Sequence, residues 1–225
     1  YCCCRLLRKK ALLDFNDLIA QYTIDLLRLK NSCLRARLII SIQDYIVKKC
    51  DRIVTTLSYI RKYALQLGVK EKNIRVVPNG VDTDLFDPSR FRPTRIKSEL
   101  DLDGKYVCLY CGRTDKWAGI DLIMELSKRF EEKLPNVQFI VVGANRSSKE
   151  SKNLIMLRGV PHEKVPQYLA AADITLIPFP ENEVSHATSP LKLFEAMSME
   201  KSIVASRVNG IEEVMTDGLN GVLVD

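Results

Sequence analysis

The stretch Thr-Ser-Pro-Leu-Lys-Leu-Phe-Glu-Ala-Met, residues 188–197, indicates most clearly how this chain folds. It follows an apolar run at residues 174–179 and a polar loop at 180–187, which predicts a buried strand, a loop and then a helix. Ser189 is expected to cap that helix and Pro190 to take its first position, where a missing N–H group costs nothing. Free N–H groups and the positive end of the helix dipole would then attract an anion beyond the strand.

Two charged side chains of this helix suggest a use for the anion site. Lys192 adds a positive charge near the helix start, and Glu195, three residues later, offers an acceptor for ribose hydroxyls. The same ten residues equally fit an ordinary capped helix whose Lys and Glu face water. The motif by itself leaves both interpretations open.

The surrounding sequence alternates between apolar strands and helices from about residue 106 onward. Strands are expected at residues 106–111, 137–143, 153–158, 173–178, 202–206 and 222–224, and helices at 119–132, 161–172, 190–199 and 211–216. Such alternation predicts an α/β fold with a parallel sheet that helices cover on both faces. In these sheets ligands bind outside the carboxyl ends of the strands.

The first part of the chain predicts a piece of a separate α/β domain. Helices are expected at residues 14–29, 41–50 and from Ser58, which caps its helix, to 67, with strands at 51–57 and 73–77. A turn-rich, proline-containing segment follows. We therefore expect residues 1–77 to belong to one domain, residues 78–94 to be a hinge or irregular linker, and residues 95–225 to form the ligand-binding domain.

Composition indicates a soluble globular protein: 46% of the residues are hydrophobic and 28% charged. No apolar run approaches the roughly 18 residues of a membrane-spanning helix. The seven cysteines include no pair of Cys-x-x-Cys motifs, and no histidine cluster accompanies them. This pattern predicts free thiols in a reducing, cytoplasmic compartment and no metal site.

Positive charge is concentrated at the start of the chain. The formal net charge is +6, and residues 1–50 hold the whole excess, with ten Lys or Arg against four Asp or Glu. The excess indicates contact with anionic lipid or an acidic partner, or else a solvated helical surface. Nucleic acid is not the expected partner, because no recognition helix or aromatic-studded basic sheet is present.

A second motif, Cys-Gly-Arg-Thr-Asp-Lys-Trp-Ala-Gly at residues 111–119, follows the first strand of the ligand-binding domain. Gly112 allows a close backbone turn, Arg113 can bind a phosphate through two hydrogen bonds, and Lys116 adds charge. Trp117 either closes over a ligand or packs on the following helix. The motif is neither the dinucleotide-binding Gly-x-Gly-x-x-Gly nor a P-loop.

Together these segments resemble glycosyltransferase family 4, in that family's order and spacing from about residue 44 to 225. The likeness also includes Val-Val-Pro-Asn-Gly-Val-Asp-Thr-Asp-Leu-Phe at residues 76–86 and Asn-Gly-Ile-Glu-Glu-Val at 209–214. The resemblance implies a GT-B fold, a Rossmann-type donor domain preceded by the end of an acceptor domain, and retaining transfer from a nucleotide-sugar. It also implies a fragment that lacks most of the N-terminal domain and the C-terminal helices and is inactive alone.

The resemblance assigns roles to particular residues. Arg113, Lys192 and Glu195 would be catalytic, with Arg113 and Lys192 on the donor diphosphate and Glu195 on the ribose. The donor-binding residues it implies are Gly112, Arg113, Lys116, Gly159, Val160, Ser189, Pro190, Leu191, Lys192 and Glu195. The nucleotide-sugar is a substrate, and neither a metal nor a further cofactor is implied.

Two positions depart from the family pattern. Ala118 stands where a lysine is expected, and Lys116 either replaces that lysine or does not. Ala187 stands where the first of two glutamates is expected. Glu181 or Glu183 either replaces that glutamate or does not. Two histidines are also left open: His162 is a helix-start or surface residue or a ligand contact, and His186 is a loop residue or a sugar contact.

We therefore expect a hexosyltransferase-type enzyme that moves a sugar from a nucleotide-sugar to a saccharide or lipid-linked acceptor. The alternatives are a catalytically silent nucleotide-sugar-binding homologue, which the two alanines favour, and a nucleotide-sugar epimerase of the same fold. The basic N-terminal region would attach the protein to the inner face of the membrane, since each basic residue near an anionic surface contributes about 1 kcal/mol.

Overall fold

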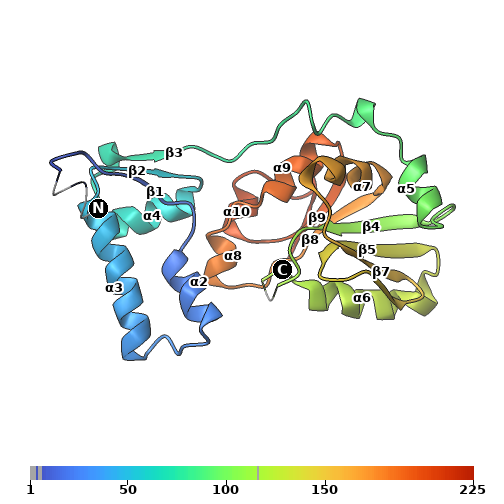
Figure 1. Ribbon diagram of the computed structural model, residues 1–225, viewed down its shortest axis with the longest axis horizontal. Helices are drawn as coiled ribbons and strands as arrows, with labels where there is room; N and C mark the ends of the chain where they lie inside the picture. Colours follow the sequence, from blue (N-terminus) through green and yellow to red (C-terminus); the bar gives the residue numbers. More distant parts are fainter. Residues whose placement is uncertain (1–3, 5–6, 116) are drawn as a thin grey trace. The chain divides into compact units, whose positions relative to one another are not determined.

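The computed structural model of the chain describes residue 4 and residues 7–115 and 117–225. These residues divide into two compact units (Figure 1). The first unit comprises Tyr1–Asn79 together with Glu181–Ser189, and the second comprises Gly80–Pro180 together with Pro190–Asp225. Both units are built from parallel strands and helices, so the predicted α/β class is confirmed.

The second unit is built on a seven-stranded sheet with the order β10-β9-β8-β4-β5-β7-β6. Its strands are β4 (Tyr106–Cys111), β5 (Val137–Ala144), β6 (Ser148–Ser151), β7 (Leu154–Arg158), β8 (Ile174–Ile177), β9 (Ser202–Ser206) and β10 (Val222–Val224). All pairs are parallel except β6 with β7. The antiparallel β6 was not predicted, because its sequence Ser-Lys-Glu-Ser has no apolar alternation and pairing with β7 alone makes it a strand.

Side-chain alternation along the central strands separates two cores. On β4, Val107 and Leu109 join one apolar cluster, whereas Cys108 and Tyr110 join the other. Helix α6 (Ile120–Lys133) covers the Tyr110 face. The opposite face is covered by α7 (Val165–Ala171), α9 (Leu191–Ser198) and α10 (Asn209–Glu212) (Figure 1).

The connection from residue 80 to β4 belongs to the second unit and is not entirely irregular. It contains the 3₁₀ turn η2 (Pro88–Arg90) and the helix α5 (Thr94–Glu99), which packs against α7. Phe86 is fully buried in the second unit's core. A further 3₁₀ turn, η3 (His162–Lys164), leads into α7.

The first unit is a three-stranded parallel sheet with the order β1-β2-β3, packed on helices. Its elements are β1 (Leu12–Asp14), α2 (Ile19–Leu26), α3 (Leu34–Lys49), β2 (Arg52–Thr55), α4 (Ser58–Gln66), η1 (Glu71–Asn73), β3 (Ile74–Val76) and α8 (Glu183–His186). Although α8 lies far along the chain, it contacts α2, and Ala187 is buried with Leu57 and Ile60.

Several helix boundaries differ from the sequence prediction. The helix expected from residue 14 begins at Ile19, because residues 12–14 pair with β2 instead. Helix α3 begins at Leu34 rather than residue 41, since the Cys33 sulfur accepts a hydrogen bond from the Ala36 amide and caps it. Ser58 is not a cap: it is the first helical residue, after an extended Leu57.

The loop expected at residues 180–187 contains the one-turn helix α8. Asn182 caps it by accepting a hydrogen bond of 2.9 Å from the Ser185 amide, which is why the polar sequence becomes helical there. Among the residues described, no helix is both long enough and apolar enough to cross a membrane.

Candidate donor site at the sheet's switch point

The chain reverses its direction across the sheet at β4, which pairs with β5 on one side and β8 on the other. In doubly wound sheets this switch point is where ligands bind. Here the loops after β4 and β8 meet closely: a Cβ on Gly119 would lie 1.6 Å from the Pro178 carbonyl oxygen. Gly119 also has a φ of 64°, so only glycine suits the start of α6.

Three more glycines lie where the carboxyl ends of β4, β5 and β7 come together. A Cβ on Gly143, whose φ is 125°, would lie 1.9 Å from the Gly112 carbonyl oxygen. The Gly112 amide donates a hydrogen bond of 2.9 Å to the Val142 carbonyl oxygen, and the Gly159 amide donates one of 3.2 Å to the Ala144 carbonyl oxygen. The loop that carries Arg113 is therefore held by backbone contacts on one side.

Lys192, in the first turn of α9, reaches this loop. Its Nζ donates a hydrogen bond of 2.8 Å to the hydroxyl of Tyr110, and lies 4.2 Å from the centre of the Tyr110 ring. The ring of Phe179 is also near, at 5.4 Å. A Cβ on Gly112 would stand 3.0 Å from Nζ, so a side chain there would crowd the ammonium.

Burial governs the ionisation of this group. Desolvation lowers the pKa of Lys192 to about 8, although the nearby Cys111, Asp115 and Glu195 work in the opposite direction. Desolvation raises the pKa of the Cys111 thiol to about 12, and it also raises the pKa of Tyr110. The lysine is the one member of this trio that titrates close to neutral pH.

The Arg113 side chain is 78% exposed, and its Nε lies 2.9 Å from Asp115 Oδ2. Asp115 also accepts a hydrogen bond from the Trp117 amide at 3.2 Å. The aspartate thus holds the guanidinium beside its own loop. Lys116, which either replaces the lysine that the family pattern expects at position 118 or does not, lies outside the described residues.

Glu195 lies one turn along α9 from Lys192 and is only 13% exposed. Its Oε1 is 2.8 Å from His162 Nε2, a contact between residues 33 positions apart. The His162 ring also lies 5.2 Å from the ring of buried Phe86. The structure therefore places His162 beside a predicted ribose-binding carboxylate.

The remaining predicted positions surround the start of α9 and the end of β7. Gly159 is exposed, and Val160 packs against the main core. Pro190 takes the N-cap position with an extended ψ of 120°, and no side chain caps α9, so the predicted Ser189 cap is wrong. The Ser189 carbonyl instead accepts a hydrogen bond of 2.9 Å from Asn79 within the first unit, and Leu191 is 54% exposed.

Both alanines that depart from the family pattern are buried. Ala118 is 4% exposed and lies in the apolar cluster under α6. Ala187 is 1% exposed and lies in the core of the first unit. Glu181 and Glu183 are exposed in that unit. A charged side chain at either alanine position would need a different packing.

His186 also belongs to the first unit. Its ring stacks on Tyr59, with 6.1 Å between ring centres and 29° between planes.

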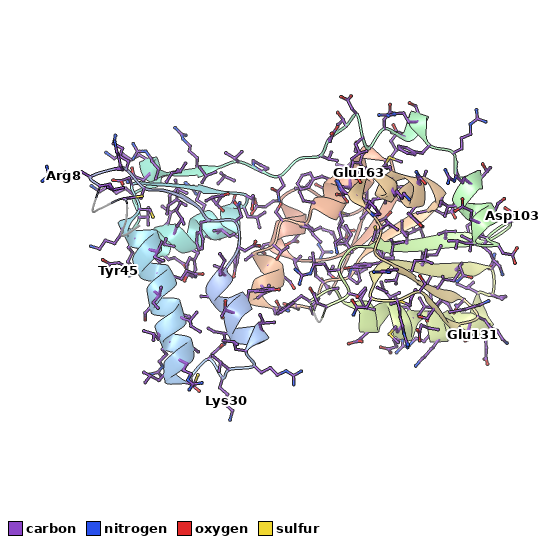
Figure 2. The ribbon with its side chains drawn as sticks, in the orientation of Figure 1. Arg8, Lys30, Tyr45, Asp103, Glu131 and Glu163 are labelled. Carbon is purple, nitrogen blue, oxygen red and sulfur yellow. The ribbon has the colours of Figure 1, made fainter. Side chains whose placement is uncertain are left out.

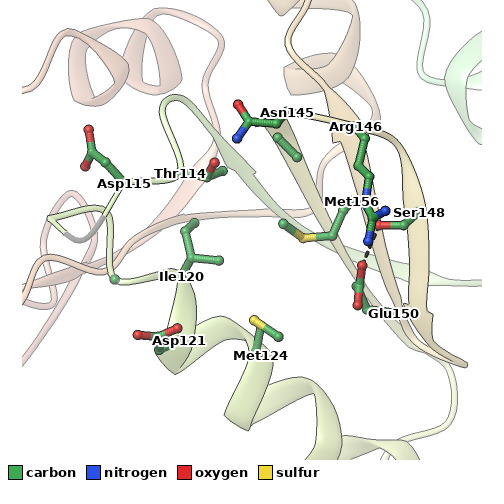
Figure 3. A pocket seen from close by; sticks show the side chains of 12 residues that line it. Thr114, Asp115, Ile120, Asp121, Met124, Asn145, Arg146, Ser148, Glu150 and Met156 are labelled. Carbon is green, nitrogen blue, oxygen red and sulfur yellow. Dashed lines mark hydrogen bonds between the residues drawn. The ribbon is translucent and has the colours of Figure 1, made fainter.

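A cavity of about 440 Å³ opens at the carboxyl ends of β4 and β5, on the α6 side (Figure 3). Ile120, Met124 and Met156 form its apolar part, and Asp115 is on its wall. In the figure Ser148 and Glu150 form a hydrogen bond on the β6 side. Within residues 4, 7–115 and 117–225, no three His, Cys, Asp or Glu side chains gather closely enough to hold a metal ion.

Sequence reasoning missed Tyr110 and the contact between His162 and Glu195. Tyr110 is one residue of an apolar strand, and only its position two residues before Gly112 hinted at the site. His162 comes two residues after the Gly159–Val160 pair, which placed it near the loop but gave no sign of Glu195.

Comparison with known proteins agrees with the family resemblance of the sequence. Residues 105–225 match the family Glycosyl transferases group 1, and residues 20–85 match Glycosyltransferase Family 4. The D-inositol 3-phosphate glycosyltransferase of Acidothermus cellulolyticus is 27% identical over 201 residues, covering 80% of this chain and 43% of that protein. The GDP-mannose-dependent alpha-(1-6)-phosphatidylinositol monomannoside mannosyltransferase of Mycolicibacterium smegmatis is 25% identical, covering 66% of this chain and 42% of that protein.

The fold matches that of Anabaena Alr3699/HepE, solved in complex with UDP-glucose. The TM-score is 0.77 at 17% identity, over 98% of this chain and 60% of that one. The chain thus spans less than half the length of the two sequence relatives, and the group 1 match alone covers more than half of the chain. With its GT-B fold and these family matches, the chain belongs to the group 1 glycosyltransferases of family 4.

Proposed function

We propose that the protein transfers a sugar, with retention, from a nucleotide-sugar donor to a saccharide or lipid-linked acceptor, and that its second unit binds the donor. The observation that carries this proposal is the placement of Lys192 against Gly112 at the switch point of the sheet, beside the loop of Arg113. The relatives support it, since one is named as GDP-mannose-dependent and the similar fold of HepE was solved with UDP-glucose.

In this proposal the two cations act on the leaving diphosphate. Negative charge grows on the diphosphate as the bond to the sugar breaks, and a partly buried ammonium stabilises that charge more than water does. Arg113 adds a second cation that can bind phosphate oxygens in a fork. Glu195 accepts hydrogen bonds from the ribose, while the Gly159–Val160 backbone borders the base.

Calorimetric titration of UDP, GDP and ADP tests the donor site, both with this chain and with the product of its whole coding sequence. We expect one nucleoside diphosphate to bind more tightly than millimolar, and Glu195→Ala to weaken it at least tenfold. Glu132, an exposed residue at the C-terminal end of α6, provides the matched control: Glu132→Ala should leave the affinity for the nucleoside diphosphate unchanged. If no diphosphate binds more tightly than millimolar and Glu195→Ala has no effect, the proposal is wrong.

A second candidate is a catalytically silent nucleotide-sugar-binding homologue. The burial of Ala118 and Ala187 favours it, because the packing of both units is built around a small side chain where the family pattern has a charge. Assays of donor hydrolysis and sugar transfer separate the two candidates. Turnover that falls on Arg113→Ala supports the enzyme, and tight donor binding with no turnover supports the silent homologue.

We further propose that the first unit attaches to an anionic membrane surface. Leu34, Leu38, Ile42 and Tyr45 are each more than half exposed and recur along one side of α3. Tyr45 projects from this helix in Figure 2. Arg35, Arg37, Lys48 and Lys49 lie on the same helix, and each would add about 1 kcal/mol near anionic lipid. The competing explanation is that this surface faces water or further protein.

A further inference from the structure

We infer that Tyr110 is a positioning residue for the donor diphosphate: its hydroxyl joins the Lys192 ammonium to the backbone of Arg113 and so presents both cations together. The inference rests on the proposed donor site and adds to it a residue that the sequence motifs do not include. It follows from contacts that lie within the second unit.

The hydroxyl makes two complementary hydrogen bonds. It accepts from Lys192 Nζ at 2.8 Å and donates to the Arg113 carbonyl oxygen at 2.5 Å. A tyrosine hydroxyl has one donor and spare acceptor capacity, so both bonds form at once. Because burial raises the pKa of Tyr110, the hydroxyl keeps the proton that it donates to Arg113.

The ring of Tyr110 also contacts the Lys192 ammonium, in addition to the hydrogen bond that the hydroxyl accepts. Lys192 Nζ lies 4.2 Å from the Tyr110 ring centre, within the range of a cation–π contact. Tyr110 itself is 1% exposed and packs under α6 with Ile123 and Phe139. A side chain on a central strand, fixed by such packing, positions its partner more accurately than a loop residue would.

This arrangement requires a residue without a side chain at position 112. A Cβ at that position would be 3.0 Å from Lys192 Nζ and 3.3 Å from the Tyr110 hydroxyl oxygen. Glycine therefore lets the ammonium reach the hydroxyl. Lysine is otherwise a flexible side chain that loses rotamer freedom when it binds a ligand, and a lysine held in advance loses less.

Tyr110→Phe removes the hydroxyl and keeps the ring. We expect about a tenfold weaker affinity for the nucleoside diphosphate that the wild type binds, since a hydrogen bond to a charged group is lost. Affinity for the corresponding nucleoside should not change. Tyr106→Phe, an exposed tyrosine at the opposite end of β4 from Gly112, makes the same chemical change and should leave both affinities unaltered.

The pH profile provides a readout that a structural role would not move. Wild-type affinity should fall above about pH 8, where Lys192 loses its proton. The groups that face this ammonium are Tyr110 and Cys111 on β4, Asp115 in the following loop and Glu195 on α9. The hydroxyl stabilises the charged lysine, so Tyr110→Phe should move the fall to lower pH.

The outcomes are distinguishable. If the wild type binds no nucleoside diphosphate, the proposed function fails and this inference fails with it. If the wild type binds a nucleoside diphosphate and Tyr110→Phe binds it with the same affinity and pH profile, only the inference is overturned. The same holds if Tyr110→Phe loses as much affinity for the nucleoside as for the nucleoside diphosphate. Should Tyr110→Phe not fold, Gly112→Ala tests the same contact by crowding the ammonium, and an unchanged pH profile there overturns the inference.

Discussion

Replacing Lys192 by methionine should stabilise the folded chain while it abolishes diphosphate binding. The pKa of this lysine is 10.5 in the absence of the fold and about 8 within it, mainly because burial removes water from the ammonium. At 1.36 kcal/mol for each pH unit, holding the charged form at pH 7 costs about 3 kcal/mol. Methionine is unbranched, similar in length and uncharged, so it avoids this cost. The Tyr110 hydroxyl loses the hydrogen bond that it accepts, which offsets part of the benefit. We therefore expect the free energy of unfolding to rise by about 1–3 kcal/mol.

The sign of the pH dependence follows from proton binding. Between pH 8 and 10.5 the unfolded lysine keeps a proton that the folded one has released, so the wild type becomes more stable as pH rises through this range. The methionine variant has no such dependence at this position. Its advantage over the wild type should be complete below pH 8 and disappear near pH 10.5.

Urea denaturation between pH 6.5 and 10 measures this difference. Trp117 is the only tryptophan and lies in the second unit, so its fluorescence reports unfolding of the unit that holds Lys192. Lys128→Met, at an exposed position of α6, is the matched control and should change the free energy of unfolding by no more than about 0.5 kcal/mol at any pH. An advantage that is absent at pH 7, or that stays constant up to pH 10, would refute the reasoning.

Three further predictions concern the loops, the ligand and the first unit. Gly143→Ala should lower the stability of the second unit by more than about 2 kcal/mol in urea denaturation, because its Cβ would lie 1.9 Å from the Gly112 carbonyl oxygen. Gly104→Ala, with a φ of 72° and nothing within 4 Å, should cost only about 1 kcal/mol. Binding of the nucleoside diphosphate at pH 8.5 should take up a fraction of a proton, measured by calorimetry in buffers of different ionisation enthalpy, and no uptake would mean that Lys192 does not contact the phosphates. The protein should sediment with anionic vesicles at low salt more than with neutral ones, and less so after Ile42→Ser; equal sedimentation with both would exclude the electrostatic attachment.

The sequence alone was sufficient to place six of the seven strands of the second unit's sheet. Strands β4, β9 and β10 have the predicted bounds, because each is a short apolar run between polar turns and needs no distant information to be recognised. The helical spacing of Lys192 and Glu195 likewise follows from local sequence. Errors occurred where the chain lacked such a pattern, as in β6, whose polar residues become a strand only by pairing with β7.

Tertiary structure alone decided how the site is assembled. Tyr110 and Lys192 are 82 residues apart, and His162 and Glu195 are 33 apart, so no local pattern relates them. The segment Glu181–Ser189 packs with the first unit because Ala187 completes an apolar core there, a preference invisible in a polar loop sequence. Sequence determined which residues form strands and helices, since that depends on neighbours along the chain. Which side chains meet at the ends of those strands depends on sheet order and on the close approach of glycine-containing loops, and both exist only once the chain has folded.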